Sequence, residues 1–549
     1  MRLPLKTFIR ISKSGVRSIG SWANNRDLFE YTSGRFLFNE ELRRVERQVY
    51  FNVDALASVI CCSVSQPVSE LASIVKLAEG GFNRVLQATF NNGYEVIARI
   101  PYHIMVPKHR AIASEAATLG LLRSRGVPVP KVLGYCAYDT NPVGTEYLLL
   151  EKLDGTALGD KWFTMDNKAR VKIMRQIVDV EKQFMSISLP ASGSLYYRKD
   201  LEASEFAVPL LEQSTLDEIV VGPTAQFAWW YQERALLNVD RGPCASSLLM
   251  PMNLVDERTR EDISDMPRSS CKTEMSPIVH IQILSKYLIL APDLEISSEH
   301  PFSRPVLRHP DFSPNNILIN SSNEIVGVID WQHSVILPLC LCSGIPHHFQ
   351  NWGDPLSERL AKPEVRLPDG FDNLSRSEQE AVQETMRRRL VHFYYAALTM
   401  RQMPDHFDAL RNENAMLRAK LFDRAGAPWE GESLSLKHTM LQAYQNWPMD
   451  LENVAPTHTI DCPVTFSEEE IRQCIGEHIE EQEKLQELKE MRSCVGVDSL
   501  GWVPDDEQLE KSREVVQAIK AGLLEHSTTE IERVALQNHF PFDDYDEDI

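Results

Sequence analysis

Polar side chains that could bind a metal ion and activate a hydroxyl group gather in residues 307–331. The pattern is His309-x-Asp311-x4-Asn316, and Asp330 follows it. Carboxylate and amide oxygens are ligands that Mg²⁺ accepts in proteins. A carboxylate beside such a metal can orient or deprotonate an attacking hydroxyl group. These residue types therefore suit hydroxyl chemistry, provided that the fold brings Asp311, Asn316 and Asp330 together.

A predicted β-hairpin supplies that proximity. Asn316 directly precedes the apolar run 317–319, and Asp330 directly follows the apolar run 325–329, with the polar turn 321–323 between them. Two antiparallel strands joined by a turn have their outer ends side by side. An isolated aspartate more often stabilises its own turn, but here the full spacing, both apolar runs and the terminal aspartate occur together.

The first half of the chain predicts an antiparallel sheet. Residues 73–78, 84–90 and 94–100 have strand character, with the glycine pair 80–81 and the turn 91–93 between them. An Asn-Gly step between two such runs is a strong hairpin signal. Two further strands are expected at 132–137 and 146–151.

A helix is expected at 107–125, after the first three strands. Glu115 lies on its apolar stripe, four residues before Leu119. A carboxylate on the buried side of a helix requires a cationic partner. Helical periodicity also marks residues 166–184 and 376–400.

The His309 segment resembles the catalytic and metal-binding segment of protein-kinase-like enzymes of the aminoglycoside phosphotransferase and choline kinase group, which carry HxDxxxxN and then Ile-Asp-Trp. The resemblance implies an α+β, bilobal, protein-kinase-like fold with an antiparallel-sheet N-lobe and a mainly helical C-lobe. It implies Asp311 as the catalytic base, Asn316 and Asp330 as Mg²⁺ ligands, and His309 as a brace for the loop.

The same resemblance implies an ATP site. Residues 79–85 resemble the phosphate-covering loop, where glycines let backbone N–H groups approach phosphate. Arg99 stands where these enzymes place a phosphate-anchoring lysine, and Glu115 where they place its helix partner. Residues 151–153 resemble the hinge that binds adenine through backbone groups. The implied nucleotide-binding residues are Gly80, Gly81, Asn83, Arg99, Glu115, Glu151 and Leu153.

Two functions follow from these patterns. The first is a phosphotransferase that moves the γ-phosphate of ATP, with Mg²⁺, to a hydroxyl group of an unidentified small molecule or protein. The second is a kinase-like scaffold or nucleotide-binding protein of weak or no activity, which the arginine at position 99 favours. The intact set Asp311, Asn316 and Asp330 favours the first.

The charge distribution limits the partners and indicates a location. The net charge of −21 argues against nucleic-acid binding, and no stretch approaches the roughly 18 apolar residues needed for stable membrane insertion. Residues 1–26 are basic, rich in serine and free of acids, as in mitochondrial transit peptides. Residues 31–42 resemble the fungal "altered inheritance of mitochondria" phosphotransferase-like proteins, which agrees with a mitochondrial location.

The expected organisation follows from these features. The segment 245–275 lacks sustained periodicity and is expected to be a disordered insertion. The predicted parts are a transit peptide at 1–26, an N-terminal extension at 27–72, the N-lobe at 73–155, the C-lobe at 156–465 with its catalytic loop at 307–331, and a helical C-terminal extension with an acidic tail at 466–549.

Overall fold

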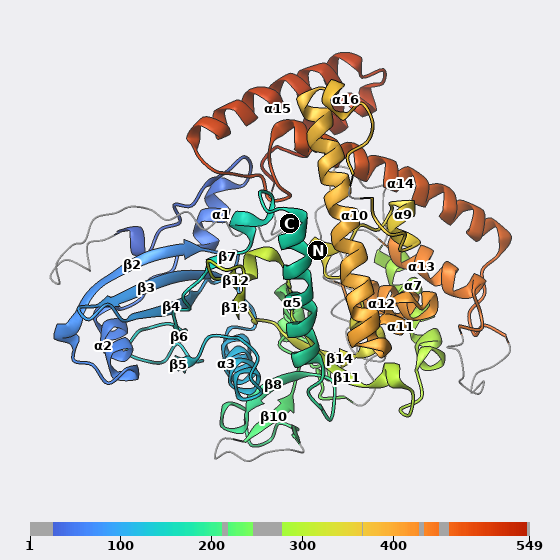
Figure 1. Cartoon of the computed structure of the whole chain (residues 1–549). Coiled ribbons are helices and arrows are strands. Elements are labelled where there is room, and N and C mark those ends of the chain that lie inside the picture. Colours follow the sequence, from blue (N-terminus) through green and yellow to red (C-terminus); the bar gives the residue numbers. More distant parts are fainter. Residues whose placement is uncertain are drawn as a thin grey trace.

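The protein has a sheet-containing N-lobe and a mostly helical C-lobe (Figure 1). This computed structural model describes residues 26–210, 218–244, 277–364, 366–427, 433–449 and 461–545. The predicted insertion at 245–275, nearly all of the predicted transit peptide and the last four residues of the acidic tail lie outside the described residues. The predicted α+β architecture is confirmed.

The N-lobe contains one five-stranded antiparallel sheet of strand order β2-β3-β4-β6-β5. Its strands form at the positions that the sequence predicts, because the Asn-Gly turn separates β3 from β4 and the glycine pair 80–81 separates β2 from β3. The strands are β2 (Leu71–Glu79), β3 (Asn83–Phe90), β4 (Glu95–Pro101), β5 (Val132–Cys136) and β6 (Tyr147–Glu151).

Helix α3 (Lys108–Ser124) contacts β5 and β6 of this sheet and also β8 (Ser194–Tyr197) of the C-lobe. Its residues from 111 to 119 are all buried. Several of them are alanines, whose small side chains allow close approach on more than one side of the helix. The helix is therefore in contact with both lobes, and Glu115 lies inside the molecule.

The C-lobe is built around α5 (Asn167–Met185) and α10 (Arg376–Gln402), which pack against each other (Figure 1). Helix α10 begins with a capping box between Ser375 and Glu378. Among the described helices, none is long and apolar enough to cross a membrane. The other helices are α4 (Gly159–Trp162), α7 (Pro277–Leu290), α8 (Leu339–Cys342), α9 (Pro355–Glu358), α11 (Pro404–Arg411), α12 (Glu413–Gly426) and α13 (Leu434–Gln445).

Short strands hold the predicted catalytic segment. The expected hairpin is β12 (Ile317–Ile319) and β13 (Ile325–Val328), and β7 (Thr156–Ala157) pairs with β12. Ile317 lies opposite Val328, so the outer ends of the hairpin meet. The remaining strands are β9 (Val208–Pro209), β10 (Ile219–Gly222), β11 (Pro305–Arg308) and β14 (Val335–Pro338).

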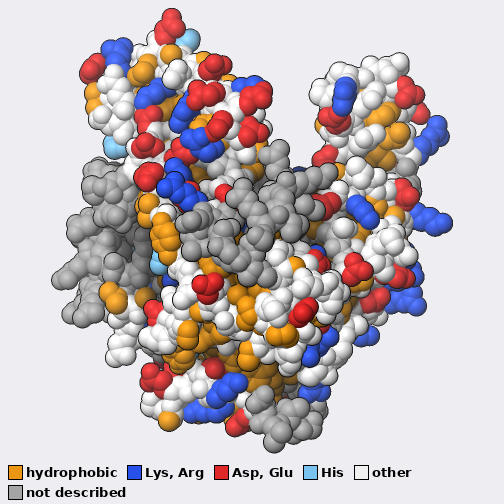
Figure 2. All heavy atoms as spheres, turned by 90° about the vertical axis from the view of Figure 1, so that its left-hand side faces the viewer, with side chains coloured by type: hydrophobic (Ala, Val, Ile, Leu, Met, Phe, Trp, Pro, Cys, Tyr) orange, Lys and Arg blue, Asp and Glu red, His pale blue; other side chains and the backbone are white. Residues whose placement is uncertain are grey.

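The two ends of the described chain meet in space. Strand β1 (Arg35–Phe36) pairs antiparallel with β15 (Trp502–Val503). The terminal regions also contain α1 (Glu40–Glu46), α2 (Val53–Ser63), α14 (Glu468–Val495), α15 (Asp506–His526) and α16 (Glu530–Asn538). On the face shown in Figure 2, acidic and basic side chains are interspersed.

Candidate active site

Asp311 lies in the loop between β11 and β12, where neighbouring polar groups hold its carboxylate. Asn316 Nδ2 donates hydrogen bonds to the Asp311 carbonyl oxygen at 2.9 Å and to Oδ2 at 3.0 Å. Ser313 Oγ donates to the same Oδ2 at 3.2 Å. These bonds fix the Asn316 amide so that its nitrogen faces Asp311 and its oxygen is left for another partner.

His309 connects this loop to the end of β13. The Asp311 N–H group donates to His309 Nδ1 at 3.1 Å, and His309 Nε2 lies 2.9 Å from the Ile329 carbonyl oxygen. Because Nδ1 accepts, Nε2 carries the proton and donates to Ile329. Burial lowers the pKa of His309 to about 4, so the ring is neutral at physiological pH. The side chain contacts backbone groups of both segments.

Asp330 follows β13 and lies beside Asn316. The Ile329 N–H group donates to the Asn316 carbonyl oxygen at 2.9 Å. Asp330 adopts a left-handed backbone conformation, with φ of 67°. Such a conformation is unfavourable for a residue other than glycine and is concentrated at functional sites. The hairpin thus brings the metal-ligand candidates together, with Asp311 bonded to one of them.

Arg99 on β4 lies across from these residues and joins three segments. Its Nη1 lies 2.5 Å from Glu115 Oε1 on α3. Its Nη2 lies 2.9 Å from Asp330 Oδ1 and 2.7 Å from Gln332 Oε1. Arg99 is 7% exposed and Glu115 is 1% exposed. The buried carboxylate that the sequence placed on α3 therefore has the cationic partner it requires.

Burial raises the pKa of two carboxyl groups in this site, those of Asp311 and Glu115. It raises the pKa of Asp311 to about 6, against the hydrogen bond from Ser313, and the charge of Asp330 adds to the rise. Burial also raises the pKa of Glu115, and the charge of Arg99 opposes that rise. Asp311 is thus a stronger base than an exposed aspartate.

The glycine loop between β2 and β3 is linked to the segment after Asp330. The Gly80 N–H group donates to the Asn83 carbonyl oxygen at 2.9 Å, which closes the loop around Gly81. Asn83 Nδ2 donates to Gln332 Oε1. Gln332 therefore accepts hydrogen bonds from both Asn83 and Arg99, and it connects the loop with the arginine.

The predicted adenine hinge follows β6. The Glu151 N–H group donates to the Lys131 carbonyl oxygen at 2.9 Å, and its carboxylate lies 2.7 Å from Arg123 Nη1. Leu153 covers Gly327 on β13 so closely that a Cβ added there would clash with its Cδ1. The hinge thus packs on the strand that leads to Asp330.

The sequence reasoning gave no role to Gln332, Ser313 or His348, which the structure places at the site. His348 Nδ1 lies 3.8 Å from Asp311 Oδ1. Gln332 and Ser313 are within two residues of Asp330 and Asp311, so the motif itself could have suggested them. His348 lies well beyond the motif in sequence, and only the tertiary fold brings it near Asp311.

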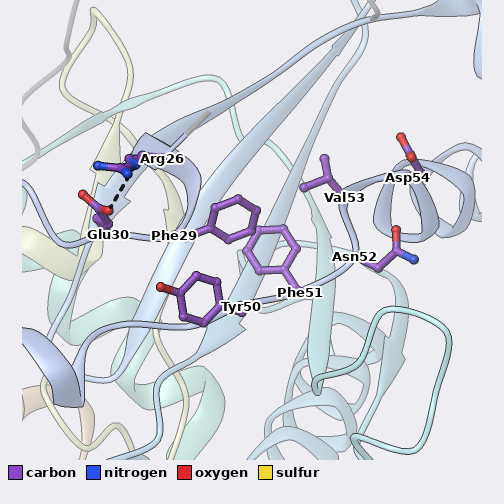
Figure 3. Close-up of a pocket in the computed structure, with 8 residues that line it drawn as sticks. All are labelled: Arg26, Phe29, Glu30, Tyr50, Phe51, Asn52, Val53 and Asp54. Carbon is purple, nitrogen blue, oxygen red and sulfur yellow. Dashed lines mark ion pairs between the residues drawn. The ribbon is translucent and has the colours of Figure 1, made fainter. Parts of the chain in front are cut away.

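A separate hollow of about 630 Å³ lies on the N-terminal extension (Figure 3). The rings of Phe29, Tyr50 and Phe51 face it, and Phe29 lies 5.1 Å from Phe51 between ring centroids. Arg26 and Glu30 form an ion pair of 4.0 Å at its edge. None of the predicted site residues lines this hollow.

Comparisons with known proteins define the class. The model of the phosphotransferase enzyme family APH matches residues 73–241 and 288–340. A subtelomeric hrmA-associated cluster protein of Aspergillus fumigatus is 31% identical over 474 residues, which cover 79% of this chain and 89% of that protein. The chain belongs to the APH phosphotransferase family, and it has the protein-kinase-like fold of that family. The resemblance read from the sequence is confirmed.

More distant similarities extend over most of the chain. Altered inheritance of mitochondria protein 9, mitochondrial, of Candida glabrata is 22% identical over 575 residues, covering 87% of each protein. The crystal structure of a thermostable mutant of aminoglycoside phosphotransferase APH(4)-Ia in ternary complex with ADP and hygromycin B is 13% identical. Its TM-score is 0.29, and the match covers 68% of this chain and 100% of that one.

Proposed function

We propose that the protein transfers the γ-phosphate of ATP to a hydroxyl group of an acceptor that has yet to be identified. The observation that supports this function best is the convergence of Asp311, Asn316 and Asp330 at the end of one β-hairpin. Asp311 takes the proton of the acceptor hydroxyl, while the acceptor oxygen bonds to the γ-phosphorus and the bond to the β-phosphate oxygen breaks.

The donor set suits Mg²⁺ bound together with a nucleotide. Asn316 uses its amide nitrogen toward Asp311, which leaves Oδ1 for a cation, and Asp330 has a second carboxylate oxygen besides the one near Arg99. Among the described residues there is no cluster of three or more metal-binding side chains. Mg²⁺ commonly uses one or two protein oxygens and completes its shell with phosphates and water. When bound, Mg²⁺ would neutralise part of the negative charge on the phosphates of the nucleotide.

The scaffold without turnover is the second candidate, and one observation favours it. The Arg99 guanidinium is already bound to Glu115, Asp330 and Gln332, all within the protein. An arginine held in this way neutralises Asp330 rather than a phosphate. Binding of Mg²⁺ and ATP without turnover of any acceptor would favour this candidate.

The test separates binding from chemistry. In an assay with Mg²⁺, ATP and a metabolite extract as acceptor, Asp311→Ala should abolish phosphate transfer and leave ATP-induced thermal stabilisation nearly intact. Asp330→Ala should reduce the Mg²⁺-dependent part of that stabilisation, because it removes a ligand. Transfer that survives Asp311→Ala would exclude the proposed role of this aspartate.

We also propose a mitochondrial location. The basic, acid-free residues 1–26 support it, and so does the similarity to altered inheritance of mitochondria protein 9 of Candida glabrata, whose name states that location. Uptake of the full chain by isolated mitochondria is the measurement that tests it.

A further inference from the structure

Residues 31–39 contain none of the proposed catalytic or nucleotide-binding residues. Their sequence is Tyr-Thr-Ser-Gly-Arg-Phe-Leu-Phe-Asn. We call this segment the strap. We propose that the strap is a positioning element that holds the glycine loop ready for nucleotide, and that the C-terminal extension holds the strap in place. This inference rests on the proposed function, since the loop's task is to cover the phosphates of ATP.

The strap is bonded directly to the first stem of the glycine loop. The Thr32 N–H group and Ser33 Oγ both donate to Glu79 Oε2, each at 2.8 Å. Glu79 is the last residue of β2 and directly precedes Gly80. Its side chain is fully buried. A buried carboxylate that accepts hydrogen bonds from the strap has few alternative positions.

The second stem is held by the same part of the chain. Arg84 lies opposite Glu79 in the β2–β3 register, and its Nη2 lies 2.9 Å from Glu79 Oε1. Arg84 Nη1 donates to the Leu28 carbonyl oxygen at 3.0 Å, and Nη2 donates to the Arg47 carbonyl oxygen at 3.1 Å. Arg84 is fully buried. Both stems of the loop are therefore fixed to residues that flank the strap or belong to it.

The strap is in turn paired with the C-terminal extension. Beyond the β1–β15 pairing, the Leu37 N–H group donates to the Gly501 carbonyl oxygen at 2.8 Å. Trp502 Nε1 donates to the Tyr31 hydroxyl oxygen at 3.0 Å. Further polar contacts join Arg35 to Asp506, and Asn39 to both Asp544 and Tyr545.

The C-terminal extension is anchored on the helical lobe. Helix α14 packs against α13, and Lys286 Nζ on α7 lies 3.4 Å from Glu470 Oε1 on α14. Helix α15 contacts both β1 and β15. Figure 1 shows α14 along the helical lobe and α15 reaching over toward the N-lobe. The contacts thus form a further connection between the lobes, besides the hinge after β6 and the contacts of α3 and Arg99 with the C-lobe. This connection ends at the glycine loop.

This connection makes the position of the loop depend on residues far from the nucleotide. A phosphate-covering loop must be mobile enough to admit ATP and restrained enough to bind it. The strap bonds to Glu79 on the first stem, and Leu28 and Arg47, on either side of the strap, accept hydrogen bonds from Arg84 on the second. Gly80, Gly81 and Phe82, between the stems, have no direct bond to the strap. Loosening the strap should therefore weaken nucleotide binding by raising the mobility of the loop, with the catalytic loop unchanged.

The test loosens the strap from the side away from the site. A Cβ added to Gly34 would clash with the Trp502 indole nitrogen and lie 2.6 Å from the Val503 carbonyl oxygen. Gly34→Ala should therefore separate β1 from β15. Gly522→Ala, in α15, is the matched control, because an added Cβ there meets nothing within 4 Å. Trp502→Phe, which removes the bond to Tyr31 and part of the ring beside Gly34 but keeps the backbone pairing of β1 with β15, is a milder variant should Gly34→Ala fail to fold.

Two quantities are measured on the full chain: hydrogen exchange of backbone amides at 79–85 without nucleotide, and the Kd for ATP with Mg²⁺. In Gly34→Ala we expect exchange at 79–85 to rise about tenfold or more, and the Kd to rise with it, while Gly522→Ala changes neither. Trp502→Phe should move both in the same direction by a smaller factor.

The outcomes separate this inference from the proposed function. Faster exchange at 501–503 with unchanged exchange at 79–85 would overturn the link between strap and loop, even in a protein that binds ATP. A wild-type protein that shows no ATP binding would instead overturn the proposed function, and exchange at 79–85 would still decide whether the strap restrains the loop.

Discussion

Arg99 makes a set of contacts that a lysine could not reproduce. A guanidinium presents five N–H donors in a planar fork, whereas an ammonium is a compact charge on a flexible stem. Here Nη1 binds Glu115, and Nη2 binds both Asp330 and Gln332. Arg99 therefore links the candidate metal ligand Asp330 to α3 and, through Gln332, to the glycine loop.

The raised pKa of Asp311 predicts an acid limb in the pH profile. In the proposed role Asp311 acts as the carboxylate, and burial raises its pKa to about 6. Protonation below that pH removes the base, so the rate of transfer should fall up to about tenfold per unit below pH 6 and reach a plateau above it. The measurement is kcat/KM for ATP between pH 4.5 and 8, because kcat/KM reports the pKa of the protein before nucleotide binds.

His348 provides the control for this profile, because it lies 3.8 Å from Asp311 and can also titrate. Burial lowers the pKa of His348 below its ordinary value. If Asp311 produces the limb, His348→Gln should keep an acid limb of the same slope. Loss of the limb in His348→Gln would assign it to the histidine instead.

At the residue scale, the sequence predicts those contacts that follow from the spacing of residues within a motif. The positions of Asp311, Asn316 and Asp330 follow from the hairpin, and the need of Glu115 for a cation follows from its place on an apolar stripe. The burial of Arg84 does not follow, because its partners Leu28 and Arg47 come from a distant segment. Charged residues inside a protein depend on partners that periodicity alone does not identify.

Strand β4, helix α3 and the end of β13 are held together by the pair Arg99–Glu115 with Asp330. Removing one member of a buried pair leaves the other without compensation, which typically costs about 3–5 kcal/mol. Arg99→Met should therefore lower the free energy of unfolding by roughly that amount. The double variant Arg99→Met with Glu115→Leu should recover part of the loss, because it removes both buried charges. Recovery stays incomplete, because Asp330 loses its cation and the buried Trp331 N–H group loses its acceptor. Unfolding in urea measures the single and the double variant against the unchanged protein.

An exposed ion pair supplies the comparison. Arg376 and Glu380 lie 3.0 Å apart on α10, with side chains 93% and 66% exposed. Such pairs contribute about 0–1 kcal/mol, so Arg376→Met should have little effect. Equal losses for Arg99→Met and Arg376→Met would show that the buried pair does not hold the three elements together.

At the element scale, local patterns locate the sheet and the long helices. The Asn-Gly turn defines the β3–β4 hairpin, and the Ser375–Glu378 box defines the start of α10. The β1–β15 pairing could not be predicted, because each strand has two residues and they come from opposite ends of the chain. Such short runs have no periodicity of their own, and only tertiary contacts produce them.

Over the whole molecule, the N-terminal and C-terminal extensions pack together, although the sequence predicts them as two separate parts. Phe38 from the N-terminal side packs in a cluster with Val495 and Val516 and with two phenylalanines near the C-terminus, Phe540 and Phe542. The cluster buries apolar surface that neither extension could bury alone. A change near the C-terminus should therefore alter the mobility of the strap, which lies on the N-lobe.

Deleting residues 540–549 tests this prediction at the largest scale. The deletion removes Phe540 and Phe542 from the cluster and also removes Asp543 and Asp544, which contact Lys520 and Asn39. Loss of a buried phenylalanine commonly costs about 3–5 kcal/mol, so the strap amides at 35–39 should exchange hydrogen at least tenfold faster. Deleting only 546–549 keeps all four residues and should leave exchange at 35–39 unchanged. If exchange at 35–39 stays unchanged in both deletions, the cluster does not hold the strap, and the contacts of the strap with residues 501–506 suffice to hold it.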